Sequence, residues 1–155
     1  MKALLIGATG STGKFLLNEL IQDDDYTSVC VFVRRPTGRS HPKLTEHVID
    51  FSKPEQYKEF IVGDVLFSCL GTTLKAAGSQ KEQWKIDFEI PATFALIARE
   101  NRVNSMVLVS SADASPNSSI FYSRMKGELE RAITELNFGQ YIIFRPGLLL
   151  RANTD

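Results

Sequence analysis

The sequence predicts an α/β protein organised around a doubly wound parallel sheet with helices on both faces. Six short apolar runs alternate with polar or amphipathic segments of a length typical of crossover connections. The first run ends in three glycines spaced three apart, and a helical pattern follows directly. With 155 residues, the chain is expected to fold as one domain.

The composition excludes several classes of protein. The 18 basic and 18 acidic side chains balance, so no net charge attracts nucleic acid or an anionic membrane. The first residues are too poor in apolar side chains for a signal peptide, and no run approaches the length of a membrane span. These features predict a cytoplasmic protein. No metal site is expected, because His41 and His47 lack partner ligands and Asp23–Asp25 has the pattern of a solvated turn.

The glycine stretch has the order strand, tight turn and helix, which is the context of a nucleotide-binding loop. Gly7 permits the turn, Gly10 lets the backbone approach a pyrophosphate, and Gly13 lets the helix pack closely on the strand. Ser11 and Thr12 add hydroxyl donors beside the free N–H groups of the helix start. The alternative is a plain glycine turn, which the position between a strand and a helix disfavours.

The second and third predicted strands carry the residues that would select the cofactor. Val29–Val33 ends at Arg34, and an arginine at this place suits the 2′-phosphate of NADP, whereas an acid would bind the ribose of NAD. NADP is therefore favoured over NAD. The third strand, His47–Phe51, contains Asp50, which either accepts a hydrogen bond from the adenine amino group or caps a turn. Ser52–Glu55 then predicts a capping box and a helix with a buried face made of Tyr57, Phe60 and Ile61.

The fourth predicted strand, Val65–Leu70, ends in a small, hydroxyl-bearing turn that includes Thr72. Ligands of open α/β sheets lie at such carboxyl ends of strands, so Thr72 is a candidate contact to the middle of the cofactor. A long helical stretch from Gln80 to Asn101 follows. Pro91 lies in its interior and predicts a kink or break at residues 89–91, because proline lacks a backbone donor.

Both cysteines fall within predicted strands, Cys30 in the second and Cys69 in the fourth. In the expected sheet the first strand separates theirs, which places the two residues about 10 Å apart. That distance is beyond the reach of a disulfide. Both thiols are expected to be buried, reduced and inert.

The fifth predicted strand, Met106–Val109, leads into Ser110 and Ser111, and Tyr122 and Lys126 follow four residues apart at a helix start. This spacing puts the phenol and the ammonium on one face. An adjacent ammonium stabilises phenolate and lowers the tyrosine pKa, which suits proton transfer to or from a carbonyl or alcohol. A serine hydroxyl at the strand end would polarise the substrate oxygen. The last helix and strand are expected at Phe121–Leu136 and Tyr141–Phe144.

Taken together, these motifs resemble the short-chain dehydrogenase/reductase superfamily. The matching stretches are Gly-Ala-Thr-Gly-Ser-Thr-Gly, the strand-end Ser-Ser, Tyr-x-x-x-Lys and Arg-Pro-Gly. Leu-Val-Ser-Ser-Ala, Lys-Gly-Glu-Leu-Glu and Phe-Arg-Pro-Gly-Leu-Leu-Leu resemble its atypical branch of NAD(P)H-binding proteins, the branch of Tat-interacting protein and its bacterial relatives. The resemblance covers essentially the whole chain and implies a Rossmann-like sheet with the strand order 3-2-1-4-5-6.

The resemblance also implies a role for each matching residue. Tyr122 would be the catalytic acid/base, Lys126 its partner and a ligand of the cofactor ribose, and Ser111, or alternatively Ser110, the substrate-orienting hydroxyl. The cofactor contacts would be Gly7, Gly10, Thr12 and Gly13 at the pyrophosphate, Arg34 at the 2′-phosphate, Thr72 at the middle, and Pro146 and Gly147 at the nicotinamide.

Two departures from the superfamily pattern leave the function open. The usual Asn-Asn-Ala-Gly is replaced by Cys-Leu-Gly-Thr, and the chain ends eight residues after Gly147, without the expected substrate-binding segment. The leading expectation is an NADP-dependent oxidoreductase acting on a small carbonyl or alcohol. The alternatives are a non-catalytic NADPH-binding regulatory or protein-interaction module and, less favoured, a sugar-nucleotide epimerase. A homodimer through helices beside the sheet is compatible with the pattern.

Overall fold

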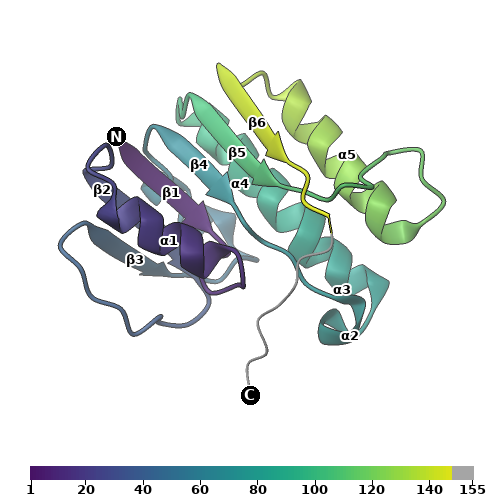
Figure 1. Cartoon of the computed structure of the whole chain (residues 1–155), viewed down its shortest axis with the longest axis horizontal. Coiled ribbons are helices and arrows are strands. Elements are labelled where there is room, and N and C mark those ends of the chain that lie inside the picture. Colours follow the sequence, from purple (N-terminus) through teal and green to yellow (C-terminus); the bar gives the residue numbers. More distant parts are fainter. Residues whose placement is uncertain (148–155) are drawn as a thin grey trace.

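The computed structural model describes residues 1–147, which form a six-stranded, all-parallel sheet (Figure 1). The strand order is β3-β2-β1-β4-β5-β6, as the sequence predicts. The strands are β1 (Lys2–Ile6), β2 (Ser28–Val33), β3 (Leu44–Val48), β4 (Val65–Ser68), β5 (Ser105–Val109) and β6 (Gln140–Phe144). The order reverses between β1 and β4, and the carboxyl ends of these strands form the crevice in which doubly wound proteins bind ligands.

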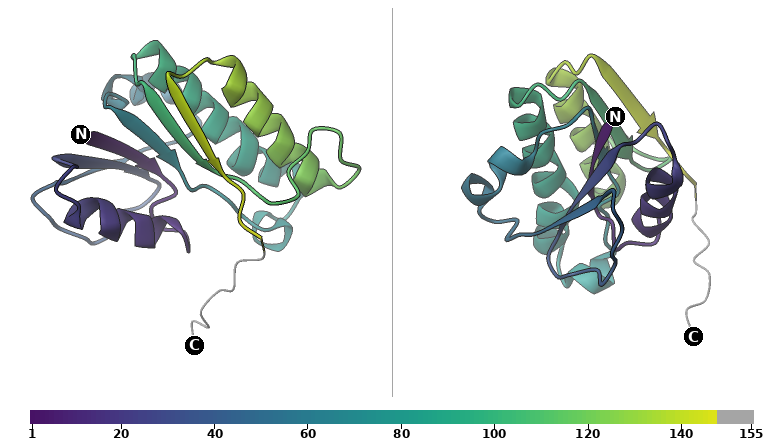
Figure 2. Two further views of the ribbon diagram at one scale, coloured as in Figure 1. Left: turned by 45° about the horizontal axis from the view of Figure 1, so that its top comes forward. Right: turned by 90° about the vertical axis from the view of Figure 1, so that its left-hand side faces the viewer.

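Helices cover the two faces of the sheet unequally (Figure 2). One face carries α1 (Gly13–Gln22), and the other carries α4 (Ile90–Glu100) and α5 (Phe121–Glu135). The shorter elements are α2 (Leu74–Ala77), α3 (Gln80–Trp84), the π-helical turn η3 (Lys85–Glu89), and the 3-10 turns η1 (Pro54–Gln56) and η2 (Lys58–Phe60).

The core is divided by the sheet, because successive side chains of each strand point to opposite faces. In β1, Leu4 and Ile6 pack toward α4 and α5, whereas Ala3 and Leu5 pack toward α1. All four are fully buried. Burial of each large aliphatic side chain contributes about 1.5–3 kcal/mol, so the central strands anchor the loops that follow them.

The kink or break predicted at residues 89–91 takes the form of a change of helix type. The helical stretch changes from α3 to the π-helical turn η3 and resumes as α4, with Pro91 in the first turn of α4. The helical backbone continues into α4, since Ile90 N donates to Lys85 O, and Pro91, which has no N–H to donate, follows directly. Asp87 lies in this π turn, and its carboxylate accepts a hydrogen bond from Thr72 N in the site described below.

Two predictions are wrong: the bounds of the third strand and the helix expected after it. β3 spans Leu44–Val48 rather than His47–Phe51, because Asp50 begins a turn that is closed by the hydrogen bond from Lys53 N to Asp50 O (3.0 Å). The hydroxyl of Ser52 donates to Asp50 Oδ1 (2.7 Å) and caps no helix. Residues 54–60 therefore form two 3-10 turns, in which Tyr57 is buried and Phe60 is exposed.

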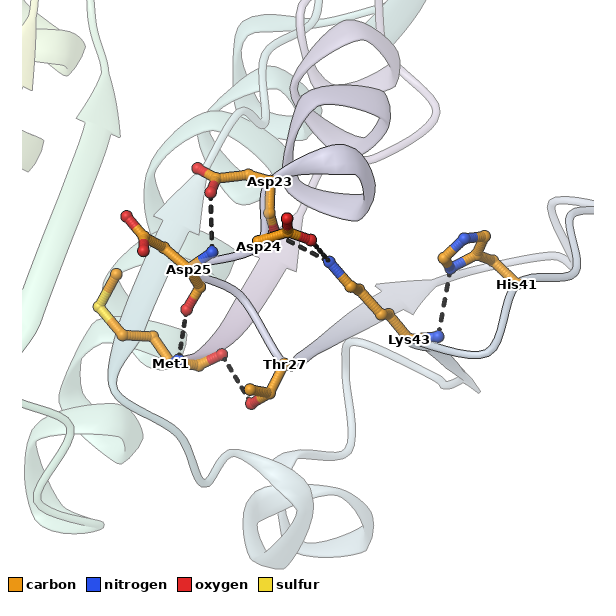
Figure 3. Close-up of polar contacts among 7 residues, drawn as sticks. All are labelled: Met1, Asp23, Asp24, Asp25, Thr27, His41 and Lys43. Atoms are coloured by element: carbon orange, nitrogen blue, oxygen red, sulfur yellow. Dashed lines mark hydrogen bonds and ion pairs between the residues drawn. The ribbon is translucent and has the colours of Figure 1, made fainter.

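At the amino ends of the strands, polar contacts tie the turn after α1 to the segment before β3 (Figure 3). The Lys43 ammonium donates to Asp23 O (2.8 Å) and lies 3.8 Å from a carboxylate oxygen of Asp24, whose side chain is fully exposed. Thr27 donates its hydroxyl to Met1 O (3.2 Å). Among residues 1–147, no cluster of His, Cys, Asp and Glu has the arrangement of a metal site.

The two cysteines are free, as predicted. Cys30 lies in β2 and Cys69 directly follows β4, with β1 between them. Cys30 is buried, whereas Cys69 is only partly buried. Burial raises the pKa of the Cys69 thiol to about 11, which keeps it protonated near neutral pH.

Candidate functional site

The glycine loop between β1 and α1 is shaped by close backbone approaches. Gly7 has φ +83°, and a Cβ on it would lie 2.5 Å from the carbonyl carbon of Cys69. A Cβ on Gly13 would lie 2.0 Å from Gly7 O. Gly10 closes the turn by donating its N–H to Gly7 O (3.0 Å). The turn and the close helix packing expected of Gly7 and Gly13 are thus present, and no side chain can be added at either position without moving backbone.

The start of α1 is suited to an anion. Thr12 stands at the N-cap, makes no side-chain capping bond, and no acidic residue lies in the first turn. The positive end of the helix dipole therefore faces the loop without a competing carboxylate, while the N–H groups of Lys14 and Phe15 donate to Gly10 O (3.1 Å) and Thr12 O (3.2 Å). Ser11 is exposed beside them.

A cleft of about 640 Å³ opens next to this loop, at the carboxyl ends of β1, β4 and β5. It is bounded by the glycine loop, the segment after β4, the end of β5 and the start of α5. Seven residues predicted for the site, or named there as an alternative, line it: Gly10, Ser11, Thr12, Thr72, Ser110, Tyr122 and Lys126.

A second hollow of about 530 Å³ adjoins the cleft on the face of the sheet that carries α1. Thr12, Cys69 and Val109 line both spaces, so the two meet along the strand ends. Pro146 lines the second hollow, while Gly147 is exposed next to it. The residues predicted to contact the nicotinamide therefore lie on this side of the strand ends.

Arg34 and Asp50 lie outside both spaces. Arg34 is exposed just after β2. Asp50 accepts hydrogen bonds from the backbone N–H (3.0 Å) and the hydroxyl (2.7 Å) of Ser52 and pairs with Lys53 at 3.4 Å. Two roles were considered for Asp50. The structure shows Asp50 in the turn, and its contact to adenine stays a prediction.

Tyr122 and Lys126 lie on one face of α5, as the spacing predicts, with Lys126 Nζ 5.9 Å from the centroid of the Tyr122 ring. The expected lowering of the tyrosine pKa is wrong for this structure. Burial, followed by the negative charge of Asp87, raises the pKa of Tyr122. Burial lowers the pKa of Lys126, against the opposing effects of Asp87, Glu130 and Cys69. A partly desolvated phenol resists ionisation, and Asp87 adds to this effect.

Asp87 is a site residue that the sequence analysis missed. It is fully buried in η3, and its Oδ1 accepts from Thr72 N (2.9 Å), while Oδ2 has no partner among the described residues. Burial raises the pKa of this carboxyl to about 6, and the Lys126 charge and the Thr72 N–H lower it by less. Gln83, four residues earlier, donates to Thr72 O (3.0 Å). The sequence signal that could have identified Asp87 is its spacing from Gln83, because polar residues four apart lie on one face of a helix.

Ser110, rather than Ser111, faces the cleft. Ser110 is buried, and its hydroxyl oxygen has no hydrogen-bond partner among residues 1–147. Ser111 is partly buried, is not among the residues that line the cleft, and accepts at its carbonyl from Ala114 N (3.1 Å). A buried hydroxyl without a partner is costly unless a ligand satisfies it.

Comparison with known proteins decides the family. A family profile described as NAD(P)H-binding matches residues 7–155. This chain belongs to that family. Protein HTATIP2 of Rattus norvegicus is 34% identical over 150 residues, covering 94% of this chain and 62% of the relative. FMP52 of Saccharomyces cerevisiae is 34% identical over 159 residues, covering 100% and 68%. The resemblance to the Tat-interacting-protein branch is confirmed.

The chain spans about two thirds of the length of these curated relatives. Solved structures agree on the fold. The oxidoreductase ylbE of Lactococcus lactis has a TM-score of 0.79 at 22% identity, covering 99% of this chain and 72% of that one. A UDP-glucose 4-epimerase of Thermotoga maritima, solved with UDP-glucose, has a TM-score of 0.75 at 13% identity, covering 94% and 55%. The protein is therefore an NAD(P)H-binding member of the short-chain dehydrogenase/reductase-like proteins with a Rossmann-like sheet.

The prediction of a cytoplasmic protein is wrong. The FMP52 relatives from Eremothecium gossypii, Saccharomyces cerevisiae and Kluyveromyces lactis are named mitochondrial proteins. The prediction rested on the lack of a signal-peptide pattern and of a membrane-span pattern, and neither feature distinguishes the cytoplasm from an organelle interior. Among the helices of residues 1–147, none is both long and apolar enough to cross a membrane.

Proposed function

We propose that this protein is an NADPH-dependent oxidoreductase that interconverts a small carbonyl compound and the corresponding alcohol. One observation carries the proposal: a single cleft brings together the glycine loop, the buried hydroxyl of Ser110, and the Tyr122–Lys126 pair. The cleft lies at the carboxyl ends of the strands, where α/β sheets bind their ligands.

The residues present fit a nicotinamide dinucleotide. The backbone at Gly10 is exposed beside the helix start, which leaves room for a pyrophosphate. Lys126 reaches the same cleft from α5 and would donate to the ribose. The other proposed contacts follow the sequence analysis: Gly7, Ser11, Thr12 and Gly13 around the pyrophosphate, Thr72 at the middle, Asp50 at the adenine, Arg34 at the 2′-phosphate, and Pro146 and Gly147 at the nicotinamide.

In the proposed reaction, a reduced nicotinamide dinucleotide held by the glycine loop and Lys126 would supply the hydride that the carbonyl carbon receives. Tyr122 donates its phenolic proton to the carbonyl oxygen, and Ser110 donates a hydrogen bond to the same oxygen. The phenolate left on Tyr122 is stabilised by the ammonium of Lys126, and it recovers a proton from solvent before the next turnover. In the reverse direction, Tyr122 accepts the proton of the alcohol. Ser110 takes the role that the sequence analysis gave first to Ser111.

The cofactor is tested by calorimetric titration with NADPH and, separately, with NADH. We expect tighter binding of NADPH, and Arg34→Ala should weaken NADPH binding about 10-fold or more, the size of a charge-assisted hydrogen bond, while leaving NADH nearly unchanged. Arg131→Ala, which removes an exposed arginine from α5, is the matched control. Equal losses for both nucleotides would refute the assignment of Arg34.

The chemistry is tested with Tyr122→Phe. Turnover should fall by about 10²–10⁴-fold, the usual contribution of a positioned acid or base, while NADPH affinity stays nearly constant. Tyr26→Phe, which changes a tyrosine near the amino ends of the strands, controls for the substitution itself. A parallel loss of cofactor binding and turnover would show that Tyr122 acts in binding rather than in proton transfer.

A non-catalytic NADPH-binding module is the second candidate. It is favoured by the pKa of Tyr122, which burial and Asp87 raise, because a phenol that resists ionisation is less ready for proton transfer. This candidate predicts tight NADPH binding, no NADPH oxidation with any of a broad panel of aldehydes and ketones, and no effect of Tyr122→Phe on either measurement.

A further inference from the structure

Large apolar side chains border the cleft together with Tyr122. Leu74 of α2 is 49% exposed, and Ile120, directly before α5, is 65% exposed. Both line the cleft, as does Phe121. Large apolar side chains that remain in water beside a cleft mark a surface suited to an apolar ligand.

The cleft offers little to a charged ligand. Among its lining residues within 1–147, Lys126 is the one charged side chain, and the proposed function assigns it to the ribose and to Tyr122. The nearby Arg124 donates to the carbonyl oxygens of Ser118 (2.9 Å) and Ser119 (3.2 Å). A substrate carboxylate or phosphate that enters beside Tyr122, away from the glycine loop proposed to hold the cofactor pyrophosphate, would lose its hydration without gaining a cation in return.

The apolar wall is held in place by aromatic packing. Trp84 stacks on Phe88 with ring centroids 4.4 Å apart, and its centroid lies 6.4 Å from that of Phe121. Arg124 also fixes the loop that carries Ile120, through its bonds to the two preceding carbonyls. The part of the wall formed by Ile120 and Phe121 is therefore preformed, which lowers the entropy lost on binding.

From this arrangement, and resting on the proposed NADPH-dependent reaction, we propose that the substrate is an uncharged aldehyde or ketone with an apolar aryl or alkyl group. The carbonyl oxygen lies at Tyr122 and Ser110. The apolar group lies against Leu74, Ile120 and Phe121. Anionic carbonyl compounds and sugar nucleotides are rejected, because the described part of the cleft leaves no cation free for them.

Matched substrate pairs test the charge selectivity. NADPH oxidation is measured with 4-methylbenzaldehyde against 4-carboxybenzaldehyde, and with hexanal against 6-oxohexanoate. We expect kcat/KM to be at least about 10-fold higher for the uncharged member of each pair. Equal or higher kcat/KM for the carboxylates, or saturable binding of UDP-glucose, would overturn the proposal.

Variants of the wall residues test where the apolar group of the substrate binds. Ile120→Asp and Leu74→Asp should each raise KM for 4-methylbenzaldehyde about 10-fold with NADPH affinity unchanged. Both positions accept aspartate, since Ile120 is the N-cap of α5 and Leu74 begins α2, so folding is retained. Leu96→Asp replaces a leucine of α4 that is 46% exposed and lies outside the cleft, and it should have no effect.

A binding assay separates this proposal from the proposed function. Trp84 is the single tryptophan, so its fluorescence reports on the wall. In protein saturated with NADP⁺, 4-methylacetophenone should quench this fluorescence saturably, and Ile120→Asp should weaken the binding about 10-fold. If NADP⁺ and NADPH do not bind, the proposed function fails and the substrate proposal fails with it. If they bind but Ile120→Asp leaves ketone binding and KM unchanged, only the substrate proposal fails.

Discussion

Asp87→Asn should change how the stability of this protein depends on pH. Asp87 is fully buried, and its pKa of about 6 lies above the ordinary value of 3.8. The folded protein therefore holds a proton on Asp87 at pH values where the unfolded chain has released it. The stability contributed by this proton is fully present below pH 3.8 and is lost as the pH rises through about 6. Asparagine keeps the shape of the side chain but does not titrate.

The size of the effect follows from the same two values. The pKa in the fold exceeds the ordinary one by about 2, and each pKa unit corresponds to about 1.4 kcal/mol, so the ionised carboxyl costs about 3 kcal/mol of stability near pH 7. Most of this loss develops between pH 4 and pH 7. The free energy of unfolding of Asp87→Asn, minus that of the natural protein, should therefore increase by about 2–3 kcal/mol over this interval.

The assay is urea unfolding followed by Trp84 fluorescence at pH 4, 5, 6 and 7, for both proteins. Asp50→Asn serves as a control, because the stability contributed by Asp50 changes with pH in the opposite direction. The hydrogen bonds from Ser52 lower the pKa of Asp50, so its contribution is lost as the pH falls. A difference between Asp87→Asn and the natural protein that stays flat from pH 4 to 7 would refute the reasoning. It would mean that Asp87 is solvated, or that it is ionised in both states.

Two further predictions concern the glycine loop and the serines. Gly13→Ala should lower the free energy of unfolding by at least about 2 kcal/mol, because the new Cβ would lie 2.0 Å from Gly7 O. Gly71→Ala is the control, because a Cβ there meets no atom within 4 Å, and its thermal melt should match that of the natural protein. Ser110→Ala should lower kcat about 10²-fold or more, the cost of removing a donor from a developing oxyanion, and Ser111→Ala should change kcat little. The reverse order of the two serine variants would return the role to Ser111.

The sheet could be predicted from the sequence because its determinants are local. The central strands are largely apolar runs, and β1, β4 and β5 lead into glycine or hydroxyl turns, so the strand order follows once the nucleotide-binding loop is identified. β3 is different. It lies at the edge of the sheet, and none of its five residues is fully buried, so its apolar pattern is too weak to fix its start and end.

The capping box after β3 failed for a related reason. Ser52, Pro54 and Glu55 have the required spacing, but the Ser52 hydroxyl also lies within reach of Asp50, two residues earlier. Short polar side chains at turns can form hydrogen bonds with several nearby groups, and the spacing of residue types does not show which hydrogen bond forms. The prediction for the long helix was correct because proline removes a backbone donor wherever it stands.

The pKa values of the site residues could not be predicted from the sequence, because they depend on residues that only the fold brings together. The spacing of Tyr122 and Lys126 places both on one face of α5, but the pKa of each is governed by burial and by Asp87, which comes from a different helix. The same carboxylate accepts the N–H of Thr72, in the loop proposed to hold the middle of the cofactor. A change at Asp87 therefore acts on the cofactor loop and on the Tyr122–Lys126 pair together. A loss of NADPH affinity in Asp87→Asn could not be assigned to either one alone. Gln83→Ala separates the two, because it removes the bond to Thr72 O and a side chain that lines the cleft but leaves the charge near Lys126 unaltered.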